Sequence, residues 1–380
     1  MSALRGLWVV PLLVMLGALS PARAAESTVE ELWHSSRGYG KKATQAQEKL
    51  KAMGAQAVNP LLELATHVYE QELMDIMGFL GSTGDEGMRV LASRLDDPNP
   101  TVRFAALGSV AGLCFMSRLE PGEYRVGDRE TVVAAMYKGF SDPLPEVRME
   151  ACVIADCLIP DPEKVPQVLS GLLVDASGPE HNWLGDYEDT VSRYASRAMV
   201  AYGAKALPVV IPLLHSDSPA QLACSAEVLG RAGEEGKKHL NDLLLLAHDD
   251  SPEVRAAAIR SLINLAGDDT RVIAVAQARL RDVNWGVSGS VRWALERHPE
   301  LVVYFKSDLV RILRDESEHT WTRSEAAELL GMCRPASRDV LLALTWAMTE
   351  PDESVAHAAA KAALELSRAP KEPAQAPQGE

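Results

Sequence analysis

The stretch Asp249-Asp250-Ser251-Pro252-Glu253-Val254-Arg255-Ala256-Ala257-Ala258-Ile259 sets the organisation of the chain. Its two acids read as a tight turn, and Ser251 stands where the N-cap of a helix is expected. Pro252 suits the first helical position, because no backbone N–H is needed there. Variants of this stretch begin at Asp97, Ser141, Ser216 and Pro351. A helix start that recurs in this way is typical of a repeat array.

Nine helix starts align on one residue, the anchor, which opens the second helix of each expected helix pair. The spacing between anchors is 29 to 35 residues, apart from two longer gaps of 45 and 44 residues. A small residue commonly follows four positions after the anchor, and an acid commonly stands five positions before it. The anchors are Leu73, Val102, Val147, Val191, Leu222, Val254, Val287, Thr322 and Val355.

Charged residues recur at fixed places in this register. The acids are Asp97, Asp142, Asp217, Asp249 and Asp282, and Arg103, Arg148 or Arg255 directly follows the anchor. An Asp can accept hydrogen bonds from amides at a helix start, and an Arg can pair with it. Because both types recur in repeat after repeat, we interpret them as contacts that hold the stack together, and we expect no catalytic role for them.

The pattern resembles HEAT repeats, in the short variant related to the bilin-lyase HEAT-like family. The resemblance covers residues 55–366 and is strongest at 97–113, 142–154 and 249–266. It weakens at 282–296 and 317–330, where Val291 replaces the small residue and Thr322 replaces an apolar anchor. The resemblance implies an all-α fold, an α-α superhelix of stacked antiparallel helix pairs with the second helices on its concave face. It does not imply bilin-lyase chemistry, because a scaffold does not fix a function.

Both ends of the chain differ from the repeats. Residues 1–24 have the features of a signal peptide: Arg5, an apolar run from Leu7 to Leu19, and the cleavage motif Ala22-Arg23-Ala24. We therefore expect an exported protein, periplasmic or secreted, that is cut after Ala24 and has no later segment apolar enough to span a membrane. A capping helix is expected over 25–54, opened by the capping box Ser27–Glu30. Residues 367–380 are rich in Pro and Ala and are expected to form a disordered tail.

The net charge of −15 disfavours phosphate-rich partners. We therefore expect a basic or neutral partner, and we expect neither nucleic acids nor anionic membranes as partners. The five cysteines show no CxxC pair and no regular spacing, so they are interpreted as buried thiols.

Catalytic and metal-binding motifs do not emerge from the sequence. It contains no GxGxxG, HExxH or GxSxG motif, and its nine histidines form no close cluster with other metal ligands. We therefore expect no catalytic residues, no metal site and no cofactor.

Two insertions interrupt the repeat period. Residues 118–129 lie between repeats, and residues 176–189 lie inside a repeat, before the Val191 helix. Insertions in solenoids often carry binding, but surface loops also tolerate added length. The second insertion holds His181 and Asp186, which belong to a candidate site for a partner or ligand.

Aromatic residues mark the turns between first and second helices. Trp285 and Trp321 fall in such turns of consecutive repeats, and Trp183 and Tyr187 fall in the same kind of turn within the second insertion. Trp and Tyr are favoured at binding hot spots, although each ring could instead cover its own turn. Trp293 and Trp346 fall within helices and are expected in the core.

These observations favour a non-enzymatic scaffold that binds a protein or peptide through its extended surface and edge loops. Two alternatives remain at this point. One is an enzyme or ligand-binding protein with a site built by the 176–189 insertion. The other is a structural component of an envelope assembly. The sequence does not indicate an oligomeric state.

Overall fold

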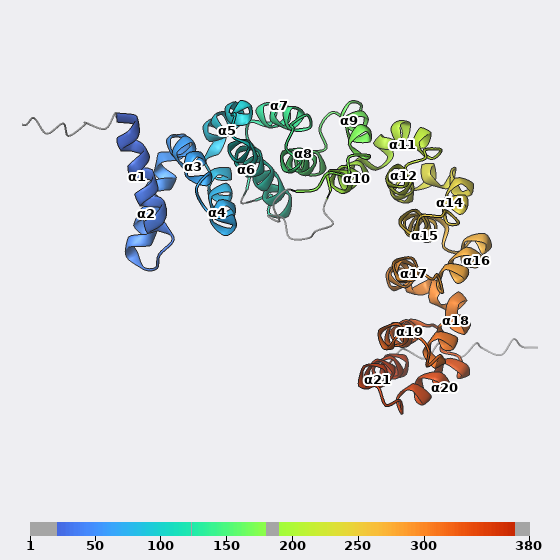
Figure 1. Cartoon of the computed structure of the whole chain (residues 1–380). Helices are drawn as coiled ribbons and strands as arrows, with labels where there is room; N and C mark the ends of the chain where they lie inside the picture. Colours follow the sequence, from blue (N-terminus) through green and yellow to red (C-terminus); the bar gives the residue numbers. More distant parts are fainter. Residues whose placement is uncertain (1–20, 123, 180–189, 369–380) are drawn as a thin grey trace, which may run out of the picture. The chain divides into compact units, whose positions relative to one another are not determined.

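The computed structural model of the chain describes residues 21–122, 124–179 and 190–368, and within these ranges it contains helices and no strands. The chain divides into two compact units, Met1–Gly139 and Phe140–Glu380 (Figure 1). The expected all-α solenoid is confirmed, because helix follows helix in antiparallel pairs joined by short turns.

The first unit holds the helices that precede Phe140. In order they are α1 (Pro21–Ser36), α2 (Lys41–Met53), α3 (Val58–Ala65), α4 (Glu70–Gly81), α5 (Gly84–Ser93), α6 (Pro100–Leu119) and α7 (Arg129–Gly139). The pairs α3–α4 and α5–α6 carry the anchors Leu73 and Val102, and both anchors are buried.

The single capping helix expected over 25–54 is wrong, because two helices lie there. The chain leaves the helical conformation between Ser36 and Lys41, where Gly40 has a φ of 88°. A residue with a Cβ rarely adopts that conformation, so Gly40 allows the reversal into α2. The capping box is also wrong, since α1 already begins at Pro21 and Ser27–Glu30 lies inside it.

Helix α6 differs from the expectation that no segment after the signal peptide is apolar enough to span a membrane. It is long and apolar enough, on length and composition alone, to cross a membrane. However, 56% of its most apolar window is buried inside the unit, where it contacts α3, α4 and α5. Such burial is typical of the core helix of a repeat.

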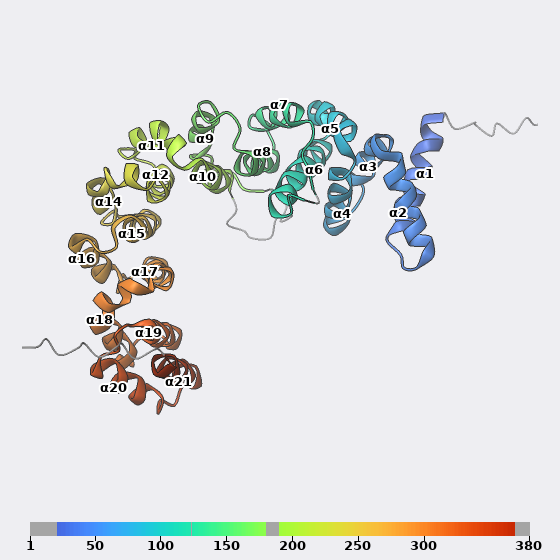
Figure 2. The same cartoon turned by 180° about the vertical axis from the view of Figure 1, so that it is seen from behind.

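The second unit continues the pairs to residue 368. Its second helices are α8 (Pro145–Leu158), α10 (Val191–Tyr202), α12 (Pro219–Arg231), α15 (Pro252–Ala266), α17 (Trp285–Arg297), α19 (Thr320–Met332) and α21 (Glu353–Arg368). Its first helices are α9 (Val165–Leu172), α11 (Leu207–Leu213), α14 (Leu240–Leu246), α16 (Thr270–Arg279), α18 (Val302–Arg314) and α20 (Arg338–Ala347), with α13 (Glu234–Lys237) as a short turn before α14. Within this unit, the second helices pack side by side in one layer and the first helices form the other (Figure 1 and, from behind, Figure 2).

The residues at the anchor positions, and the small residues four positions later, lie in the cores of the two units. All nine anchors are buried, including the polar Thr322. Each apolar anchor contributes about 1.5–3 kcal/mol by leaving water. The small residues four positions later are fully buried, which lets neighbouring helices approach closely; they are Ala106, Ala151, Ala195, Ala226, Ala258, Ala326 and Ala359.

Four of the nine second helices begin with Pro as the sequence predicts, and α15 does so with a different hydrogen bond from the one expected. Pro occupies the first turn of α6, α8, α12 and α15. Ser251 is the N-cap of α15, yet its side chain makes no capping bond. Instead, Asp249 Oδ1 accepts the Ser251 backbone N–H at 2.8 Å, which fixes the turn before the helix.

Candidate partner-binding surface

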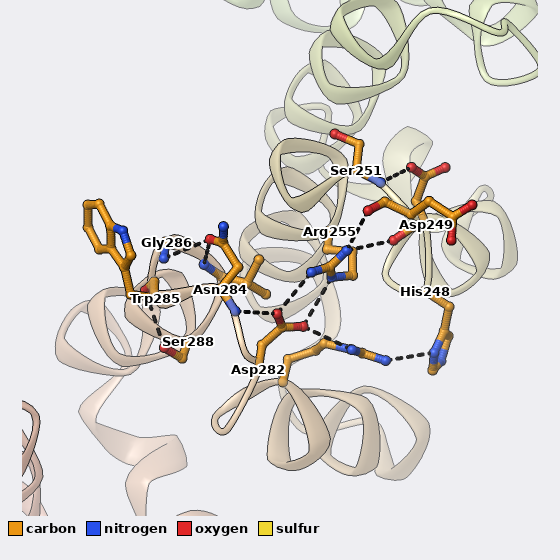
Figure 3. Close-up of polar contacts among 12 residues, drawn as sticks. His248, Asp249, Ser251, Arg255, Asp282, Asn284, Trp285, Gly286 and Ser288 are labelled. Carbon is orange, nitrogen blue, oxygen red and sulfur yellow. Dashed lines mark hydrogen bonds and ion pairs between the residues drawn. The ribbon is translucent and has the colours of Figure 1, made fainter. Parts of the chain in front are cut away.

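A ladder of Arg and acid side chains fixes the turns of the second unit (Figure 3). The Arg255 guanidinium donates through Nη1 to the carbonyls of Asp249 and Asp250 in its own turn, both at 2.9 Å. It also donates to both carboxylate oxygens of Asp282 in the next repeat, at 3.0 and 2.9 Å. One buried side chain therefore ties its own turn to the next one, as expected for a stacking contact.

Asp282 is the most heavily bonded acid of the ladder. Besides Arg255, it accepts from Arg279 Nη1 at 2.9 Å and from the Asn284 backbone N–H at 3.0 Å. Desolvation acts to raise the pKa of Asp282, but these hydrogen bonds outweigh it and lower the pKa to about 2. The carboxylate is therefore a charged structural group and is unsuited to proton transfer near neutral pH.

The same connection recurs at a spacing of 27 residues. Arg148 pairs with Asp175 at 2.9 Å, and Arg323 pairs with Glu350 at 2.8 Å. The sequence pattern missed Asp175, because the 176–189 insertion separates it from its anchor. It missed Glu350 because that repeat uses a Glu in place of Asp.

Trp285 departs from the repeat pattern at the start of α17. It occupies the first helical position, where Pro stands in four other second helices, and the Asn284 side chain caps the helix. Its side chain is 75% exposed, and the preceding Val283 is fully exposed. Figure 3 shows the indole ring pointing away from the Arg255–Asp282 contacts. The ring therefore does not cover its own turn.

Trp321 lies near the start of α19 and contacts the neighbouring helix. Its ring is 4.9 Å from the guanidinium carbon of Arg292 on α17, and the side chain remains 42% exposed. Arg292 is almost fully buried and forms an ion pair with Glu325, while its Nη2 has no hydrogen-bond partner. This cation–π contact packs the Trp321 indole against Arg292 and leaves part of the ring exposed to solvent.

Trp293 was expected in the core, and this was wrong. It is 47% exposed, and the Arg297 guanidinium lies 4.8 Å from its ring. Trp293 stands six residues after its anchor, where three other repeats carry Arg260, Glu328 and Lys361 but another carries the fully buried Val228. The exposure of Trp293 is therefore a feature of this repeat. Trp346 is half-buried, with the Arg323 guanidinium 5.9 Å from its ring.

We use the name tryptophan surface for the three exposed side chains Trp285, Trp293 and Trp321 of the neighbouring helices α17 and α19. Trp285 and Trp293 are eight residues apart on α17, about 12 Å along its axis. Trp321 reaches the same helix through Arg292. In the structure Trp285 and Trp321 lie in the first turns of α17 and α19 and are exposed, and Trp293 is exposed as well.

Acidic side chains border this surface. Desolvation raises the pKa of Glu296, and the neighbouring charges of Glu325 and Glu328 raise it further. Arg292 lowers this pKa in part, but the net shift is upward, so the three carboxylates lie close enough to repel one another. A cationic group placed beside them would be stabilised.

The remaining sequence candidates fall elsewhere. Trp183, Tyr187, His181 and Asp186 lie outside the described residues. The described base of their insertion is held by backbone bonds from Val191 and Ser192 to the carbonyls of Ser177 and Asp175, both at 2.9 Å.

Two further exposed aromatic residues, both tyrosines, were not among the predicted site residues. Tyr39 and Tyr69 are almost fully exposed in the α1–α2 and α3–α4 turns of the first unit. Their position in the turn, matching that of the tryptophans, was the signal that could have revealed them.

The ranges that the structure describes contain no group of three metal-ligating side chains. The five cysteines, all within the described ranges, form no disulfide bond, and four of them are buried. Burial raises the pKa of Cys224 to about 12, which keeps that thiol protonated and unreactive.

Comparison with known proteins identifies HEAT repeats in the chain. A family model described as HEAT repeats matches residues 208–296. No curated protein matches the chain. Solved structures with a similar fold include importin β, with 13% identity and a TM-score of 0.58, and yeast importin β (Kap95p), with 12% identity and a TM-score of 0.58.

A Kap95p structure with RanGDP is also similar, with 12% identity and a TM-score of 0.57. These alignments cover 90%, 91% and 91% of this chain but 55%, 53% and 53% of the three importin chains, so the chain spans about half of their length. The short-repeat, bilin-lyase-like subtype stays a prediction. The importin likeness shows the solenoid fold alone, and the family match shows that the chain contains HEAT repeats.

Proposed function

We propose that the protein is a non-enzymatic, exported scaffold that binds a protein or peptide, with the tryptophan surface at the centre of the interface. Trp285 carries this proposal. The fold does not require Trp at the first position of α17, because Pro serves there in α6, α8, α12 and α15. An exposed indole gains no burial energy in the free protein, whereas Trp is favoured where partners bind.

The solenoid fold supports a protein partner. HEAT-repeat solenoids are commonly protein-binding scaffolds, and Kap95p, which has a similar fold, binds RanGDP. The carboxylates of Glu296, Glu325 and Glu328 favour a partner that places Lys or Arg beside an apolar side chain. The net charge of −15 disfavours nucleic acids as partners.

Export rests on residues 1–24, and we propose a mature chain that begins after Ala24 and has no membrane span. Fractionation of the native cell, followed by the intact mass of the purified protein, tests this part. A mass that retains residues 1–24 in a cytoplasmic fraction would reject it.

The binding proposal is tested by Trp285→Pro together with site-specific photocrosslinking. The Asn284 backbone already has the extended conformation that must precede a Pro, with φ −89° and ψ 117°. The variant should therefore fold while lacking the indole. A photoreactive residue at position 285 should capture one saturable partner at native expression, and Trp285→Pro should weaken binding of that partner by at least about tenfold.

Tyr304 provides the matched control. It is an aromatic residue on α18, 47% exposed, on a first helix of the same unit. Tyr304→Ala should leave binding unchanged, and a photoreactive residue there should not capture the partner. Equal loss of binding in both variants, or no capture at position 285, would reject the tryptophan surface as the binding site.

A further inference from the structure

Among the described residues, no segment covers the outer stacking face of the repeat formed by α20 and α21. Leu341, Thr345 and Met348 recur at i, i+4 and i+7 and thus share one face of the α20 segment. All three are exposed, as is Leu364 on α21. Terminal repeats of solenoids normally present a polar outer face, so an apolar stripe at this place is unexpected.

The repeat register shows that this stripe is a stacking face. Met348 stands seven residues before its anchor, as Leu280 and Ala247 do in their repeats. Leu280 is 2% exposed and Ala247 is fully buried, whereas Met348 is 47% exposed. Thr345 stands ten residues before its anchor. At the same position, Gln277 donates to the carbonyl of Tyr304 in the next repeat, at 3.0 Å.

Helix α21 also exposes an apolar residue at a position that is buried in an internal repeat. Leu364 stands nine residues after its anchor and is 48% exposed, whereas Ile263 at that position is 2% exposed. Gly331 also stands there in its own repeat, and a Cβ on it would lie 2.8 Å from Ala362 of α21. This position therefore faces the second helix of a following repeat. In the last repeat, both helices present apolar residues where a neighbouring helix pair would pack.

We propose that a second copy of the chain covers this face, in a symmetric dimer that joins the two α20–α21 pairs. Residues 369–380 contain no Leu, Ile, Val, Met or aromatic residue, so they lack the bulky apolar side chains that fill this position in internal repeats. The same face of a second copy supplies them, and a twofold axis makes the contact self-complementary and closed.

Sedimentation velocity of the full chain over a wide concentration range tests the dimer. The wild-type chain should pass from monomer to dimer as concentration rises. Met348→Glu and Leu364→Glu should each weaken dimerisation by about a hundredfold or more, because the twofold axis brings two carboxylates into an apolar contact. Both positions are about half exposed, so circular dichroism should show unchanged helicity.

Leu342→Glu is the matched control. Leu342 is equally exposed on α20 but turned about 100° from Leu341, and the equivalent Ala274 of α16 is exposed within the stack. This variant should dimerise like the wild type. The proposal fails if the chain is monomeric at all concentrations, or if the Met348 and Leu364 variants dimerise normally. It also fails if Leu342→Glu is equally disruptive, or if deleting residues 369–380 is required for dimerisation, since the tail would then be the occupant.

Discussion

Asp282 links three parts of the second unit through a single carboxylate. Two arginines and one backbone amide from neighbouring segments converge on it, and 2% of its side chain is exposed. The lowering of its pKa from 3.8 to about 2 corresponds to about 2 kcal/mol of folding free energy.

The direction of the pH dependence follows from that lowered pKa. The unfolded chain takes up the proton first, so the contribution of Asp282 is complete above about pH 4 and disappears as the pH falls through 2. Asp282→Asn should therefore lower the midpoint of urea unfolding at neutral pH. It should also lose less stability than the wild type on acidification from about pH 4 to 2. Equal acid sensitivity of the two proteins would contradict this role.

Glu150 on α8 has the opposite dependence. Burial raises its pKa from 4.5 to about 7, so the folded state holds the proton while the unfolded state has released it. Stability is therefore complete below about pH 4.5 and falls as the pH rises through 7. Glu150→Gln should be more stable than the wild type at pH 8, by up to about 3 kcal/mol, with little difference at pH 4. Thermal melts at both pH values check this, and Glu227→Gln, in a partly buried ion pair of α12 with Arg260, serves as control.

At the scale of the helix, the Trp285→Pro variant shows whether the Trp285 indole contributes to the stability of the fold. Replacing Trp285 with Pro restores the residue found at this position in four other second helices. It also reduces the freedom of the unfolded chain, which should raise stability by about 0.4–1 kcal/mol. We expect Trp285→Pro to melt at a temperature equal to or above that of the wild type. A clear fall in melting temperature would mean that the indole supports the fold.

The helices also show what the sequence can and cannot predict. Anchors, small residues and Pro-led helix starts are local patterns repeated many times, so the nine pairs and their buried residues could be predicted. Asp175 could not be, because an insertion moved it out of register. The exposure of Trp293 could not be predicted from the register, because the same position carries Arg260 and Lys361 in two repeats but the fully buried Val228 in another. The break at Gly40 was missed because a capping-box match outweighed two nearby glycines.

On the scale of the second unit, the repeats should differ in local stability. In a solenoid each repeat contacts only its neighbours, so a terminal repeat gains stacking energy on one side only. α12 and α15 have neighbours on both sides, and Leu222 to Ala226 are all buried. Within the described residues, α20 contacts α18, α19 and α21, and no described helix packs on the far side of α20 and α21.

Hydrogen exchange measured at two concentrations connects that gradient to dimerisation. At low concentration, amides of α20 and α21 should exchange faster than those of α15, because opening the last repeat disrupts one interface instead of two. At high concentration, a second copy should slow exchange in α20 and α21 and leave α15 unchanged. In Met348→Glu, exchange should be fast at both concentrations. Slow, concentration-independent exchange at α20 and α21 would mean that the end of the solenoid is stable without a neighbour, and the apolar stripe would then need another explanation.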